Sequence, residues 1–90
     1  MVSKGIRKGN LRFVFTRSGA SRVLLAGDFN QWKPLPMRKQ KDGSFVANLD
    51  LRPGTHEYKF IVDGQWTVDP DNSAWALNPY GTLNSVAVVE

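Results

Sequence analysis

The sequence predicts an all-β sandwich in a single domain, and three observations support this prediction. Apolar and polar residues alternate with period two in several short segments, as they do in half-buried strands. Turns that contain Gly or Pro separate these segments at intervals of roughly 8–12 residues. The chain has 90 residues, which suits one domain, and no part of it shows a convincing helical period. The expected architecture is therefore a β-sandwich of short strands.

Two strands are expected in the first third of the chain. Residues 10–16 alternate in β-favouring residues and place Leu11, Phe13 and Phe15 on one face. After a turn, residues 22–26 form a short apolar run that we expect to be a buried strand.

Three more strands are expected in the second half. Residues 45–52 and 57–62 alternate again, and residues 83–89 are rich in valine. The stretch 69–81 is expected to be irregular, and a loop of that length in so small a domain is usually functional or packed onto the body. Within this stretch, Asp69 is expected to mark a chain bend.

The pair Asp63 and Gly64 lies between two strand-like runs and is the preferred pair for a two-residue type I′ hairpin. With that turn, Ile61 lies opposite Trp66, and Lys59 lies on the same face as both.

The opposite face of this hairpin carries Tyr58, Phe60 and Val62 and is the better candidate for the core. Burying Lys59 without a partner would cost several kcal/mol, so Trp66 is expected outside the core beside a lysine. An exposed indole next to a donor suits a sugar, because a pyranose presents C–H groups on one face and hydroxyls at its edge. On pattern alone, the alternative is that Trp66 covers a sandwich edge and Lys59 is ordinary surface charge.

The residues that could bind a metal or act in catalysis argue against an enzyme. The chain has no cysteine and a single histidine, His56, so we expect no metal site and no cofactor. His56 is expected to face solvent or to cap a strand. Glycoside hydrolysis generally needs two carboxyl groups roughly 5–9.5 Å apart in a cleft. The acidic residues lie mainly in turns and on separate strands, so we expect no enzyme activity.

Charge is unevenly distributed along the chain. Residues 1–41 hold ten Lys and Arg against one Asp, whereas residues 42–90 hold two against seven acidic residues, and the total is +4. Such a basic half can bind nucleic acid or an anionic membrane, but charges on solvated strand faces that pair across a sheet explain it equally well. Nucleic acid is not expected as a partner, because the basic residues lack interleaved aromatic platforms.

The chain has neither an apolar run that could span a membrane nor a secretory signal after its basic start. We therefore expect a cytoplasmic protein with no membrane partner. The expected organisation is a basic N-terminal extension at residues 1–9 and one domain at residues 10–90.

Four motifs occur in an ordered series. They are GDFNQW at residues 27–32, GTHEYKFIVDGQW at 54–66, DP at 69–70 and GTLNSV at 81–86. With these motifs the sequence resembles the family 48 carbohydrate-binding modules. That family includes the glycogen-binding domain of the AMP-activated protein kinase β subunit and the early-set domains of isoamylases and branching enzymes.

The resemblance implies an immunoglobulin-like early-set β-sandwich that binds α-1,4-linked glucans such as glycogen, starch or cyclodextrins without catalysis. It implies that Trp32 and Trp66 stack on glucose rings and that Lys59 donates to sugar hydroxyls. Asn84 would donate and accept through its amide, and Thr82 would add a further polar contact.

Four other residues are expected to have separate roles. Tyr80 stands where kinase-subunit members of the family carry leucine, and it would fill the same role or add a third stacking platform. Phe29 is expected in the core, and Asn30 is expected to stabilise its loop. Trp75 is expected to pack onto the body, with an added binding surface as the alternative.

Besides an α-glucan, the resemblance implies a kinase or a glucan-active enzyme as a partner. The alternative function is therefore a protein-interaction module of the same fold.

Overall fold

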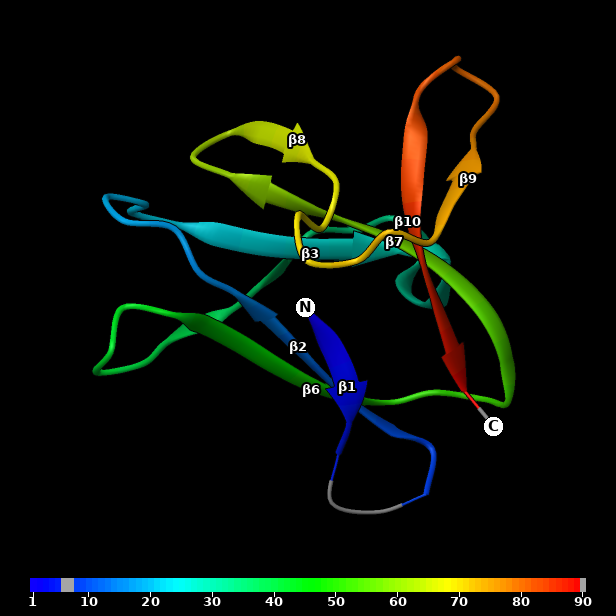
Figure 1. Ribbon diagram of the computed structural model, residues 1–90, viewed down its shortest axis with the longest axis horizontal. Helices are drawn as coiled ribbons and strands as arrows, with labels where there is room; N and C mark the ends of the chain where they lie inside the picture. The colour runs from blue at the N-terminus through cyan, green and yellow to red at the C-terminus, as the bar shows by residue number, and fades with distance from the viewer. Residues whose placement is uncertain (6–7, 90) are drawn as a thin grey trace.

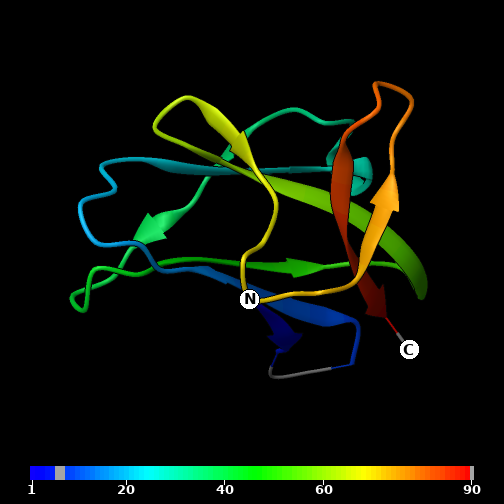
Figure 2. The same ribbon diagram turned by 45° about the horizontal axis from the view of Figure 1, so that its top comes forward.

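Side chains from two antiparallel sheets meet in one core (Figures 1 and 2). The computed structural model describes residues 1–5 and 8–89. Phe13 and Phe15 of one sheet meet Tyr58 and Phe60 of the other edge-to-face, with ring centroids 5.0 and 5.1 Å apart. These rings are at most 1% exposed, and the predicted β-sandwich is confirmed.

The first sheet has the strand order β1-β2-β6-β5. Its strands are β1 (Val2–Lys4), β2 (Asn10–Phe15), β5 (Arg38–Lys39) and β6 (Phe45–Asp50). β2 and β6 pair along their whole length, with Phe13 opposite Ala47 and Phe15 opposite Phe45. Their alternating pattern therefore puts one row of apolar side chains into the core. β1 lies within the segment expected as an extension and forms an edge strand against β2.

The second sheet has the order β4-β3-β7-β10-β9, with β8 also paired to β7. Its strands are β3 (Val23–Gly27), β4 (Leu35–Pro36), β7 (Gly54–Val62), β8 (Gln65–Thr67), β9 (Trp75–Leu77) and β10 (Leu83–Val89), and a 3₁₀ turn, η1 (Asp28–Asn30), follows β3. The long strand β7 pairs with β3 along one edge, and with β10 and then β8 along the other.

The hairpin between β7 and β8 has the predicted turn and register. Asp63 and Gly64 have φ values of 49° and 88°, as a type I′ turn requires, and Ile61 lies opposite Trp66. The Asp63 carboxylate also accepts a hydrogen bond from the backbone N–H of Arg22 at 2.8 Å. Trp66 is 53% exposed while the other face of β7 lies in the core, so the assignment of the two faces is confirmed.

The stretch 69–81 is less irregular than expected. It contains β9, which pairs with β10 so that Leu77 lies opposite Leu83. Trp75 is 54% exposed, and the expectation that it packs onto the body is wrong. In Figure 1 the β9–β10 hairpin projects to one side of the first sheet.

Asp69 marks the expected bend, where its carbonyl oxygen accepts from the Asn72 N–H at 3.3 Å, and its carboxylate has a further role that was not predicted. Its carboxylate is 1% exposed and accepts a hydrogen bond from the Tyr58 hydroxyl at 2.7 Å. Its backbone N–H donates to Ser85 Oγ at 2.7 Å, and the amino group of Met1 lies 2.7 Å from the carboxylate. A tyrosine in the core needs an acceptor for its hydroxyl, and Asp69 supplies it.

Candidate functional site

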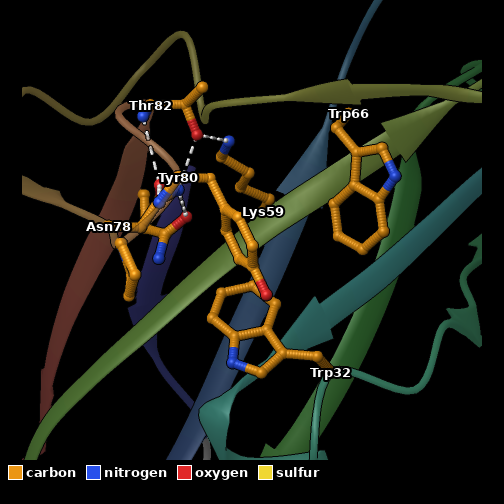
Figure 3. Close-up of a pocket in the computed structure, with 8 residues that line it drawn as sticks. Trp32, Lys59, Trp66, Asn78, Tyr80 and Thr82 are labelled. Atoms are coloured by element: carbon orange, nitrogen blue, oxygen red, sulfur yellow. Dashed lines mark hydrogen bonds between the residues drawn. The ribbon is translucent and has the colours of Figure 1, made fainter.

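A cleft lies on the outer face of the second sheet, where two hairpins attach to one edge of β7. β10 pairs with residues 54–58 and β8 with residues 60–62, so Lys59 lies between the two paired regions. The cleft has a volume of about 530 Å³. Its lining residues are Trp32, Lys59, Trp66, Asn78, Pro79, Tyr80, Thr82 and Asn84 (Figure 3).

The loop after β3 presents Trp32. A Cβ at Gly27 would lie 2.3 Å from the Phe29 ring and 2.8 Å from the Glu57 carbonyl oxygen, so only glycine allows this close approach. Asn30 Oδ1 accepts from the Gly27 N–H at 3.0 Å, and Phe29 packs against the core. The expectations for Phe29 and Asn30 are confirmed.

Asp28 anchors the same loop to β7. Its carboxylate accepts from the Glu57 N–H at 3.0 Å and lies 3.3 Å from His56 Nδ1. His56 is half-buried, and its Nε2 lies 2.8 Å from the Arg52 carbonyl oxygen. The imidazole thus ties the start of β7 to the η1 loop, which agrees with the expected strand-capping role and not with the solvent-facing alternative.

Three aromatic rings border the cleft. The indoles of Trp32 and Trp66 have centroids 6.5 Å apart and planes inclined at 49°. Tyr80 stands at the tip of the β9–β10 hairpin, is 89% exposed, and extends its ring toward the indoles in Figure 3. Gln31 and Trp32 both have φ of 58°, a left-handed conformation that is unfavourable for large side chains and is held here by the anchored loop.

Polar side chains form the remaining side of the cleft. Lys59 Nζ donates to Thr82 Oγ1 at 3.1 Å, and Asn84 Nδ2 donates to Glu57 Oε1 at 2.9 Å. Asn84 is 5% exposed, so little of its amide reaches the cleft surface. The ammonium group of Lys59 is thus held in place by a residue of the neighbouring hairpin.

Asn78 is a residue of the cleft that was not predicted from the sequence. Its Oδ1 accepts from the backbone N–H groups of Tyr80 and Thr82 at 3.0 and 3.1 Å. Its Nδ2 donates to Thr82 Oγ1 at 2.6 Å and to Asn84 Oδ1 at 3.1 Å. The run Asn-Pro-Tyr-Gly is a turn signal that could have pointed to Asn78, because asparagine side chains commonly bond to the backbone two residues on.

The structure brings the six predicted site residues together around one cleft. They are Trp32, Lys59, Trp66, Tyr80, Thr82 and Asn84. Trp75 does not line this cleft, although it is exposed on the same hairpin.

The arrangement is suited to binding. The cleft offers aromatic faces, an ammonium group, a hydroxyl and amide groups, and no carboxylate lines it. Among residues 1–5 and 8–89, no three His, Asp or Glu side chains are grouped so that they could hold a metal ion. In the same part of the chain, no helix is long and apolar enough to cross a membrane.

Comparison with known proteins extends these observations. A family model described as the glycogen recognition site of AMP-activated protein kinase matches residues 10–90. The AMP-activated protein kinase subunit beta-1 of Sus scrofa is 44% identical over 72 residues, which are 80% of this chain and 57% of that protein. The Bos taurus beta-1 subunit is 46% identical over 72 residues, 80% of this chain and 26% of its own length.

The beta-2 subunit of Mus musculus is 41% identical over 73 residues, and again the match covers 26% of that protein. The chain therefore spans only 26 to 57% of the length of these relatives.

Solved structures of larger proteins contain the same fold. A maltogenic amylase from S. marinus matches 90% of this chain with a TM-score of 0.74 and 25% identity, over 13% of its own length. A protein of Salmonella typhimurium assigned as an alpha amylase matches 94% of this chain with a TM-score of 0.74 and 26% identity, over 14% of its length. Because the family model matches nearly the whole chain and its motifs line one cleft, the chain belongs to the family of the glycogen recognition site of AMP-activated protein kinase.

Proposed function

We propose that this chain is a non-catalytic module, at residues 10–90, that binds α-1,4-linked glucans in the cleft between its two hairpins. The observation that carries the proposal is the pair of indoles, Trp32 and Trp66, whose planes are inclined at 49° with centroids 6.5 Å apart. An α-1,4-linked chain curves, so successive glucose rings present inclined faces that suit inclined platforms. A flat β-1,4-linked chain would suit platforms that lie in one plane.

The polar groups fit the same ligand. Lys59 lies between the two hairpins, and Thr82 and Asn84 lie beside it. Sugar hydroxyls at the edge of a stacked ring would meet these groups while the ring face covers an indole. Tyr80, which is 89% exposed, would add a third aromatic surface from the hairpin tip.

The expected interaction energies indicate weak binding at a single site. A tryptophan face that covers about 100 Å² of apolar surface contributes on the order of 2.5 kcal/mol. Two such faces and a few hydrogen bonds must exceed an association cost of roughly 4 kcal/mol or more. The expected Kd is therefore of micromolar to millimolar order, roughly −4 to −8 kcal/mol. A polymer offers many adjacent sites, which raises retention without tighter single-site contacts.

The direct test is a tryptophan fluorescence titration with β-cyclodextrin beside a parallel titration with cellobiose. We expect a saturable change with the α-linked ring alone. The absence of any change with β-cyclodextrin, in protein shown to be folded, would overturn the proposal.

Replacing either indole should remove binding while the fold survives. Trp66→Ala and Trp32→Ala each remove a stacking face of about 2.5 kcal/mol, so we expect affinity to fall at least tenfold and glycogen retention to be lost. Affinity electrophoresis in glycogen gels measures this. Trp75→Ala is the matched control, because Trp75 is equally exposed at 54% but lies outside the cleft. Retention of both folded cleft variants at the wild-type level would contradict the assignment.

A second candidate function is docking onto another protein domain. The observation that favours it is the exposed apolar surface of the β9–β10 hairpin, with Trp75 at 54% and Leu77 at 72% exposure. Relatives of this chain are subunits of a kinase, and similar folds occur within amylases, so we propose a kinase or a glucan-active enzyme as the partner. Partners that stay bound after amylase treatment would support direct docking, whereas partners released with the glucan would count against it.

A further inference from the structure

The hydrogen bonds on the polar side of the cleft have directions that the backbone fixes. Asn78 Oδ1 lies 3.0 Å from the N–H of Tyr80 and 3.1 Å from the N–H of Thr82. A backbone N–H only donates, so the atom that receives both must be the amide oxygen. The other end of the Asn78 side chain is therefore its NH₂ group (Figure 3).

The orientation of the Asn78 amide also determines the donors and acceptors in the neighbouring side chains. The Asn78 NH₂ donates to Thr82 Oγ1 at 2.6 Å and to Asn84 Oδ1 at 3.1 Å, which uses both of its protons. Since Asn84 presents its oxygen to Asn78, its own NH₂ points to Glu57 Oε1 at 2.9 Å. An ionised carboxylate only accepts, so this last bond agrees with the direction of the others.

Thr82 is left as a donor. Its Oγ1 accepts from Asn78 and from Lys59 Nζ at 3.1 Å, and these two bonds occupy both lone pairs of the hydroxyl oxygen. The hydroxyl proton is then the group that Thr82 has left for a ligand.

The groups that these bonds leave unused determine whether this surface mainly donates or mainly accepts hydrogen bonds. Beyond these bonds, Lys59 retains two ammonium protons and Thr82 its hydroxyl proton, whereas the largely buried Asn84 retains one amide proton and one lone pair on Oδ1. The polar side of the cleft therefore offers donors in excess of acceptors.

We propose that Asn78 is a positioning residue that makes this surface a donor surface, so that the site recognises glucan oxygens as acceptors. This inference rests on the proposed function. In an α-1,4-linked chain, hydroxyl protons of neighbouring glucose units are engaged with each other along the rim, and the oxygens remain free to accept. A donor surface matches that rim, and it also tolerates α-glucans whose hydroxyls have been converted to ethers, which accept but cannot donate.

The variant Asn78→Asp tests the role of Asn78 with almost no change of shape. An aspartate keeps the oxygen that accepts from Tyr80 and Thr82, but it replaces the donating NH₂ with an acceptor. The Thr82 hydroxyl would then turn its proton toward residue 78 and lose it for the ligand. We expect β-cyclodextrin affinity to fall about tenfold or more. Asn48→Asp is the matched control, because it adds the same charge at an exposed position of β6, and its affinity should equal that of the wild type.

A second arm uses the unaltered protein and does not depend on how a variant folds. β-Cyclodextrin and its 2,6-di-O-methyl derivative are titrated in parallel. The derivative has lost the protons on O2 and O6 but keeps the oxygens, so we expect an affinity within about tenfold of the parent.

Three results would be decisive against the inference. A tenfold or greater loss with the methylated ring, or wild-type affinity in folded Asn78→Asp, would overturn the donor surface while leaving glucan binding in place. No binding of β-cyclodextrin by the wild type would instead remove the proposed function and this inference together.

Discussion

At the scale of single residues, the contact between Tyr58 and Asp69 is an example of a polar pair that the core depends on. The tyrosine hydroxyl donates to the carboxylate at 2.7 Å and accepts from Asn72 Nδ2 at 3.0 Å. Burial raises the pKa of the Tyr58 hydroxyl far above its usual value, and the nearby Asp69 adds to this, so the phenol stays protonated and donates. The pair ties the long loop after β8 to the central strand.

Tyr58→Phe should destabilise the fold without altering the cleft. The substitution leaves ring volume unchanged but removes a partner from Asp69 and Asn72, at a cost of about 1–3 kcal/mol. For a domain of this size, 1 kcal/mol lowers Tm by roughly 4–8 °C. Thermal unfolding followed by circular dichroism measures the change. Because the side chain faces the core, β-cyclodextrin affinity below the lowered Tm should match the wild type, and an unchanged Tm would show that the pair contributes nothing.

Residue roles were predictable from sequence where one local pattern determines them. Trp66 and Lys59 follow from a turn and the alternation of a strand, which involve only neighbouring residues. Asp69 was not predictable in this way. Its partners Tyr58 and Ser85 lie 11 and 16 residues away along the chain, and only the folded sheet shows that they meet Asp69.

At the scale of elements, the turn between β5 and β6 is stabilised by an ionised side chain. Asp42 accepts from the Ser44 N–H at 2.9 Å and from the Ser44 hydroxyl at 2.6 Å. These bonds, that of the hydroxyl first, lower the pKa of Asp42 below its usual value of 3.8. A group with a lowered pKa stabilises the folded state fully above its unfolded-state pKa, and this contribution is lost as the pH falls through the folded-state pKa.

Asp42→Ala should therefore lower Tm, by an amount that depends on pH. We expect the difference from the wild type to be constant above about pH 5 and to shrink as the pH falls below 3.8. Thermal melts between neutral pH and about pH 2.5 measure it. Asp42→Asn keeps an oxygen acceptor without the charge and serves as the control. A difference that grows on acidification would contradict the role of the carboxylate.

Elements with strong local patterns were predicted, and the short ones were not. The strand predicted at residues 83–89 agrees with β10, and the hairpin register is as expected. β1 and β9 have three residues each, too few for an alternation to be recognised. They become strands because β2 and β10 offer them an unpaired edge.

At the scale of the whole molecule, the two halves of the chain interleave in both sheets. β2, from the basic half, pairs with β6, and β3 pairs with β7. The charge asymmetry of the sequence is therefore not an asymmetry between two sides of the fold. The net charge of +4 is modest, and the cleft has one cationic side chain among its lining residues.

Glucan affinity should accordingly be nearly independent of salt. The ligand is neutral, so binding releases no condensed counterions, and we expect less than a twofold change in β-cyclodextrin affinity between about 50 and 500 mM NaCl. Calorimetric or fluorescence titrations at both concentrations measure this. A fall of tenfold or more would contradict stacking and neutral hydrogen bonds as the source of the affinity.

On the edge of β7 that pairs with β10 and β8, strand pairing is interrupted at Lys59, and this affects how the two hairpins can move. Among the described residues, β8 and β10 share an edge of β7 but pair with β7 and not with each other. Beyond Lys59 no backbone hydrogen bond joins the two hairpins in the described part of the chain, and the bond from Lys59 Nζ to Thr82 Oγ1 connects them through side chains. A glucan that contacts Trp66 on one hairpin and Thr82 on the other would hold the two hairpin ends together. Ligand binding would then reduce the motion of one hairpin relative to the other.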